Sequence, residues 1–183
     1  MYGDEWNSSR LVLHHHWGRF FRNEQRYAES EQIFREIEAV LESDRFPDGT
    51  RANFRPRTVY ERRLSLYFHM QLLYWRSDSI DKSIEYGRKV VRLYDEQLYR
   101  HRVGNSRTAK ANLILSLRTK ASNLFAQGKV KEAVEFYREE LDLIVDLWGE
   151  GHENVKRARR ELAGVTRWIR NAPETSSQTK PTN

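Results

Sequence analysis

Three consecutive histidines, His14, His15 and His16, are the residues of this 183-residue chain that most directly suggest chemistry. Imidazole is a common metal ligand, but neighbouring residues on a helix point about 100° apart, so three in a row do not close around one ion. The chain has no Cys, and no carboxylate follows at helical spacing before Glu24. We therefore expect the histidines to line a surface or to pack, and we predict no metal ion and no other cofactor.

The acidic residues have the pattern of a solvated helix and not of a catalytic pair. One stretch contains Glu139, Glu140, Asp142 and Asp146. They stand beside Arg138 and other charges, as is typical of ion pairs along an exposed helix face. The sequence has neither a glycine-rich phosphate loop after a strand nor a nucleophile-elbow motif. We therefore predict no catalytic residues and expect a protein that is not an enzyme.

Basic and aromatic side chains are the remaining candidates for a function. Lys and Arg number 32 against 26 Asp and Glu, the net charge is +6, and aromatic residues make up 12% of the chain. Positive charge favours a partner that is negatively charged, such as nucleic acid, an anionic membrane or an acidic protein. No segment approaches the ~18 consecutive apolar residues of a membrane span, and no secretory signal is visible. We expect no membrane association and a cytoplasmic protein, with the nucleus as an alternative.

Helices must position these side chains, because residues that form turns are scarce. The 9 Gly and 4 Pro cluster at a few places, whereas a β fold needs turn residues at short, regular intervals. Residues 46–56 contain several of them and are predicted to be a linker. Apolar residues at helical spacing predict seven helices, at residues 9–24, 27–44, 57–76, 79–100, 106–127, 130–148 and 153–170.

An internal repeat relates these helices in pairs. Small residues stand twelve apart in two places, Gly18 with Ser30 and Ala121 with Ala133, and an aromatic residue follows four positions after the second. A weaker copy begins at Gln71, at offsets of 53 and 50 residues from the other two. Small residues let the two helices of a hairpin approach closely, while the aromatic fills the space below. The spacing predicts three helix-turn-helix units.

The three units resemble tetratricopeptide repeats (TPR), in which small residues lie twelve apart and an aromatic follows. In the third unit, Leu147, Gly149 and His152 are similar to the link between repeats in the kinesin light chain subclass, although Glu153 replaces the usual proline. The second unit departs from the pattern, because Gly87 stands at the aromatic place.

This resemblance implies an all-α fold: a right-handed α-solenoid of three helix-turn-helix hairpins with a C-terminal capping helix. The domain would span residues 11–170, between an N-terminal segment at residues 1–10 and a disordered tail at residues 171–183, which lacks an apolar face. Repeats of this kind serve as scaffolds in many settings, so the resemblance implies a protein-binding adaptor.

The family's register also selects the residues of a concave groove. Applied to this chain, it predicts a groove lined by basic and aromatic side chains: His15, His16, Arg19, Arg22, Phe68, His69, Trp75, Arg76, Arg118, Phe125, Arg157, Arg160, Arg167 and Trp168. Guanidinium groups bind carboxylates and phosphates, and aromatic anchors dominate many interfaces. We expect an acidic protein or peptide as the partner and, by the resemblance, one that contains Trp.

Other readings of the same residues stay open. Arginine is common on any solvated helix face. Part of the positive charge can therefore be ordinary surface charge that does not indicate a binding partner. A single strand of RNA would suit a basic surface with aromatic side chains for stacking, and its binding would depend strongly on salt. Self-association through the aromatic residues, as a homo-oligomer or a structural subunit of a larger assembly, is a second alternative. Chaperone tails are not expected, because His15, Arg19 and His69 replace the residues of the carboxylate clamp.

Overall fold

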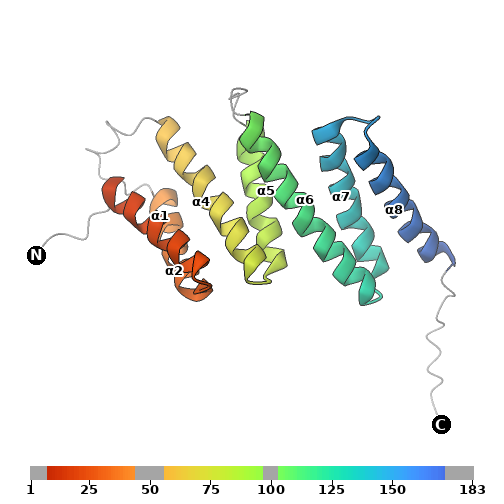
Figure 1. The fold of residues 1–183 in the computed structure, drawn as a ribbon, viewed down its shortest axis with the longest axis horizontal. Helices are drawn as coiled ribbons and strands as arrows, with labels where there is room; N and C mark the ends of the chain where they lie inside the picture. The colour runs from red at the N-terminus through yellow and green to blue at the C-terminus, as the bar shows by residue number, and fades with distance from the viewer. Residues whose placement is uncertain (1–7, 44–55, 97–102, 172–183) are drawn as a thin grey trace, which may run out of the picture. The chain divides into compact units, whose positions relative to one another are not determined.

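The structure is a computed structural model that describes residues 8–43, 56–96 and 103–171 (Figure 1). Within these ranges every regular element is a helix, so the predicted all-α class is confirmed. The predicted tail and N-terminal segment fall almost wholly outside the described residues. The same is true of the linker, whose last residue, Pro56, begins a helix.

The helices of the described ranges agree closely with those expected from apolar periodicity. They are α1 (Ser8–Asn23), α2 (Tyr27–Glu42), α4 (Pro56–Arg76), α5 (Ile80–Glu96), α6 (Val103–Ala126), α7 (Val130–Trp148) and α8 (Glu153–Asn171). The last residues of the helix expected at 79–100 lie outside the described part. None of these helices is both long enough and apolar enough to cross a membrane.

The chain divides into two compact units, residues 1–116 and residues 117–183, with the boundary inside α6. In the first unit, α1 packs against α2, α4 packs against α5, and α2 joins the two pairs by packing against α4. In the second unit, α7 packs against α8.

The turns that follow α1, α4 and α6 share one backbone conformation. Gln25, Asp78 and Gly128 have positive φ angles of 61°, 57° and 77°, and they are separated by the same 53 and 50 residues as the sequence repeat. The residue after each donates its N–H to the carbonyl five positions earlier, at 2.8, 2.8 and 2.9 Å. This is the Schellman motif, which ends a helix with one left-handed residue. The turn therefore recurs at the predicted period.

The paired small residues lie where the helices of each hairpin approach. The hydroxyl of Ser30 donates to the carbonyl oxygen of Gly18 at 2.8 Å, and that of Ser83 donates to the carbonyl oxygen of Gln71 at 3.1 Å. The two corresponding alanines of the third hairpin are completely buried. The expected close approach at these positions is confirmed.

Candidate binding site

Helices α1 and α4 of the first unit bring together residues that the sequence places 47 to 54 positions apart. The imidazole rings of His15 and His69 lie 4.9 Å apart between centroids. Nη1 of Arg22 is 3.0 Å from Nδ1 of His69, and Nη1 of Arg76 donates to Oδ1 of Asn23 at 3.3 Å. With the exposed Arg19 of α1, these side chains form what we call the α1–α4 site: His15, Arg19, Arg22, Asn23, His69 and Arg76.

Arg22 is the unusual member of the α1–α4 site, because its charge is buried without a carboxylate. The residue is only 6% exposed, and its Nε has no hydrogen-bond partner among the residues described. The other two nitrogens meet His69 and Asn23, which carry no negative charge. Burial lowers the pKa of Arg22, and the neighbouring Arg76 and Arg19 lower it further. A buried guanidinium without a counter-charge is costly, so Arg22 raises the free energy of the folded unit.

The two histidines of the α1–α4 site are held in their neutral forms. Burial lowers the pKa of His15 to about 4, and Arg19 and His16 add to the effect. Burial likewise lowers the pKa of His69 to about 3, with further contributions from His15 and Arg22. A neutral His69 can accept a hydrogen bond from Arg22 at Nδ1, in agreement with their 3.0 Å separation. An anion in the site would raise both pKa values, because it favours the charged imidazole.

Glu38, a buried carboxylate elsewhere in the first unit, differs from Arg22 because it has counter-charges. Glu38 of α2 is 6% exposed. It accepts hydrogen bonds from the hydroxyl of Tyr86 at 2.8 Å and from Nη1 of Arg35 at 2.9 Å, and Lys89 lies 3.5 Å away. This network links α2 to α5, and Arg35 and Lys89 compensate the negative charge of Glu38 within the unit. Arg22 has no such network within the described ranges.

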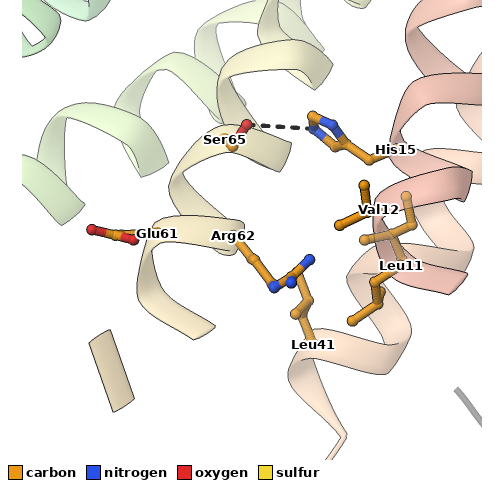
Figure 2. A pocket seen from close by; sticks show the side chains of 8 residues that line it. Leu11, Val12, His15, Leu41, Glu61, Arg62 and Ser65 are labelled. Carbon is orange, nitrogen blue, oxygen red and sulfur yellow. Dashed lines mark hydrogen bonds between the residues drawn. The ribbon is translucent and has the colours of Figure 1, made fainter. Parts of the chain in front are cut away.

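A pocket of about 280 Å³ adjoins the α1–α4 site and shares His15 with it. Figure 2 shows His15 and Ser65 facing each other, with 3.4 Å between Nε2 and Oγ. The pocket is smaller than the ~300–1,000 Å³ of typical small-molecule sites, so its size suits a single side chain. Its lining is mixed, with four apolar residues, Leu11, Val12, Ile37 and Leu41, and four polar ones, His15, Glu61, Arg62 and Ser65.

Sequence reasoning found His15 but missed Glu61 and Arg62. The apolar lining carries a signal in the sequence, because Leu11, Ile37 and Leu41 lie on the buried stripes of α1 and α2. No sequence signal distinguishes Arg62 from the other arginines of the chain. Its position at the pocket follows from how α4 packs.

Arg118 of the second unit, a predicted groove residue, is already paired. Its Nε donates to Oε1 of Glu140 at 2.8 Å, and its Nη2 lies 3.5 Å from Glu161. Glu140 is 1% exposed, and burial raises its pKa. The expectation that Glu140 lies on a solvated face is wrong, because the carboxylate is buried between helices and bound by Arg118. The charge of Arg118 is thus compensated within the unit.

Phe125 and Trp168 are the predicted groove residues that the second unit brings together. Their rings meet edge to face with centroids 5.9 Å apart, and they are 38% and 51% exposed. Arg157, Arg160 and Arg167 are exposed on α8.

The remaining predicted residues lie on α1 and α4. His16 is exposed, while Phe68 and Trp75 are half-buried. The ring of Phe68 meets His69 edge to face, with centroids 5.7 Å apart. Within the described part of the chain, no group of three His, Asp or Glu side chains could hold a metal ion.

No protein family, curated protein or solved structure matches this chain. The geometry of the two units is therefore the basis for assigning a function.

Proposed function

We propose that this chain is a non-catalytic adaptor that binds an acidic segment of another protein. The observation that carries the proposal is Arg22, a buried guanidinium with no carboxylate among the residues described. A partner's carboxylate beside the exposed Arg19 and Arg76 would reduce the electrostatic cost of this buried charge without reaching the buried Nε itself. The exposed Arg19 and Arg76 would attract further acidic side chains of the same segment.

The pocket beside His15 suggests what accompanies the acidic residues. Its apolar lining residues and its size suit one apolar or aromatic side chain, and it shares His15 with the α1–α4 site. A Trp or another large apolar residue next to Asp or Glu would fill both places. An anchor of this kind commonly supplies much of the binding energy of an interface.

The fold proposed for the whole domain is a right-handed α-solenoid of three TPR-like hairpins, with α8 as the C-terminal cap and the kinesin light chain subclass as the nearest type. The recurrent turns at Gln25, Asp78 and Gly128 support it, as do the hydroxyl–carbonyl bonds of Ser30 and Ser83. In such repeats the first helix of each hairpin lines the binding surface. The α1–α4 site lies on two of these first helices.

The test is binding of an acidic peptide that contains one Trp, measured by fluorescence anisotropy with two charge-reversed variants of equal net charge. Arg19→Glu/Arg76→Glu changes the α1–α4 site. Arg92→Glu/Arg138→Glu is the control, because Arg92 and Arg138 are 79% and 58% exposed and belong to α5 and α7. We expect the first variant to weaken binding by about tenfold or more, equivalent to about 1.4 kcal/mol, and the control to change it little. Circular dichroism checks that both variants keep their helices.

Two results would overturn the proposal. One is equal weakening by both variants, since that would mean that only overall charge matters. The other is tighter binding of a single-stranded RNA oligonucleotide than of the peptide at the same salt concentration, which would assign the surface to nucleic acid.

A further inference from the structure

One face of α1 exposes large apolar side chains that the α1–α4 site does not use. Leu13, Trp17 and Phe20 are 55%, 47% and 48% exposed. Together with Phe21 they form what we call the α1 aromatic face. Its three rings contact one another, with centroids 5.6 to 5.8 Å apart, and the guanidinium of Arg26 lies 4.4 Å from the ring centre of Phe21.

Apolar residues on protein surfaces are usually exposed singly, whereas those of the α1 aromatic face are exposed side by side. Scattered apolar side chains need no explanation, whereas large apolar side chains that are exposed side by side favour an interaction site. The rings of the α1 aromatic face already hold one another in place, so ordering them in an interface costs little entropy. At about 100° per residue, the face lies on the side of α1 opposite to His15, Arg19 and Arg22. A partner on this face would leave the α1–α4 site accessible.

The charges that flank the face indicate which partner it fits. From Arg10 through Leu13, Trp17 and Phe20 to Glu24, the spacing alternates between three and four residues, which is the pattern of a seam between two helices. The N–H of Glu24 bonds to the carbonyl of Phe20 at 3.0 Å, so Glu24 continues the helical turn. The seam begins with a positive charge and ends with a negative one. It is therefore complementary to itself when reversed.

We propose that the α1 aromatic face binds a second copy of this chain, with the two α1 helices antiparallel about a two-fold axis near Trp17. Arg10 and Glu24 are equally far from Trp17 along the helix, so each Arg10 lies opposite the Glu24 of the other copy. Leu13 lies opposite Phe21 for the same reason. An antiparallel pair also opposes the helix dipoles, whereas a parallel pair would place like charges together. The contact is closed and isologous.

This dimer would hold two α1–α4 sites in one particle. An adaptor with two sites gains avidity for a partner that carries two acidic segments, with no new contact inside either site. The dimer itself rests on the α1 aromatic face alone. It can therefore exist even if the proposed acidic ligand is wrong.

Sedimentation velocity of the full chain and of two Trp variants is the first test. We expect the intact chain to be dimeric at about 100 µM and Trp17→Glu to be monomeric with unchanged helical content. Trp168→Glu is the matched control, because Trp168 is 51% exposed in the second unit, and it should remain dimeric. A monomeric intact chain would overturn the proposal. So would dissociation by Trp168→Glu but not by Trp17→Glu.

Charge reversal and cross-linking test the orientation. Arg10→Glu and Glu24→Arg should each weaken the dimer by about threefold, within the range of exposed ion pairs, and the two changes together should restore it. The chain has no native Cys, so a mixture of Arg10→Cys and Glu24→Cys chains should give the mixed disulfide on oxidation. Disulfides only between identical variants would contradict the antiparallel arrangement.

Discussion

The side chain of Gln71 fills, beside Gly87, the space that Phe34 fills beside Gly18. A Cβ on Gly18 would lie 2.4 Å from the ring of Phe34, and a Cβ on Gly87 would lie 2.5 Å from Nε2 of Gln71. The second hairpin has thus exchanged the large and the small residue of this contact. The glycine at the aromatic place, which looked like a departure from the repeat, is a compensated change.

The exchange makes Gly87 intolerant of a side chain. We expect Gly87→Ala to destabilise the protein by about 1–3 kcal/mol through overpacking, despite a gain of about 1 kcal/mol in helix propensity. Adding Gln71→Ala should relieve the closest contact, leaving Cδ1 of Leu113 at 3.0 Å, so the double variant should lose less than the sum of the single ones. Urea denaturation measures all three.

Gly164 provides the control for this prediction. It lies in α8, and a Cβ there would meet no atom within 4 Å. Gly164→Ala should therefore stabilise the chain by about 0.5–1 kcal/mol. If Gly87→Ala proved equally benign, the close approach of Gln71 would be refuted.

Changing a left-handed turn residue to glycine should stabilise the protein, and changing one from glycine should destabilise it. Gln25→Gly and Asp78→Gly are each expected to raise the free energy of unfolding by about 1 kcal/mol, because glycine adopts a positive φ without steric cost. Gly128→Ala should lower it by a similar amount. Thermal denaturation of the three variants checks the signs. A neutral Gly128→Ala would contradict the turn geometry.

Acidification should destabilise the first unit through His15 and His69. Their pKa values in the folded chain, about 4 and about 3, lie below the ordinary value of 6.5. Below pH 6.5 the unfolded chain binds protons that the folded chain does not bind. The stability present above that pH is therefore lost as the pH falls toward 4.

The urea midpoints at about pH 7.5 and about pH 5 measure this loss. His15→Gln/His69→Gln should lose less stability on acidification than the intact chain does. Identical pH dependence in the intact chain and the double variant would show that the histidines are not buried as described.

Removing the Arg118 side chain should destabilise the protein, because the buried carboxylate of Glu140 then loses its counter-charge. We expect Arg118→Met to destabilise the protein by roughly 1–3 kcal/mol at neutral pH. This is less than for a fully buried pair, because the Arg118 side chain is 35% exposed and partly screened. The loss should shrink on acidification, because protonation neutralises Glu140. A Glu140→Gln/Arg118→Met chain should lose less stability than Arg118→Met at neutral pH, because it has no buried carboxylate. Chemical denaturation of the two variants at two pH values measures these losses.

The helices could be predicted from sequence because apolar periodicity is a local signal. The turn at Gly128 could also be predicted, since glycine marks a left-handed residue. The positions of the turns at Gln25 and Asp78 could be predicted from the helix ends as well, but their positive φ angles could not, because no glycine marks them.

The residues of the α1–α4 site could be predicted from the sequence, but their burial and their pKa values could not. The family's register selected His15, Arg22 and His69, and the structure brings them together. Their burial depends on the packing of α4 against the first hairpin, which no local pattern reports. The same limit applies to Arg118, whose partner Glu140 looked like any other acidic residue on an exposed helix. A count of arginines therefore overstates the charge that is free to act on a partner.

The bond between Ser30 and Gly18 determines where this chain can change in length. One extra residue between Glu24 and Arg26 would break the turn in which the N–H of Arg26 bonds to the carbonyl of Phe21, and would disturb the approach of Ser30 to Gly18. An insertion between α2 and α4 leaves every pairing inside the hairpins in register. The unequal offsets of 53 and 50 residues between hairpins, beside the constant spacing of twelve within them, show the same tolerance. Insertions and deletions should therefore be accepted between hairpins and rejected within them, which makes the segment between α2 and α4 the place for a tag or a fluorescent label.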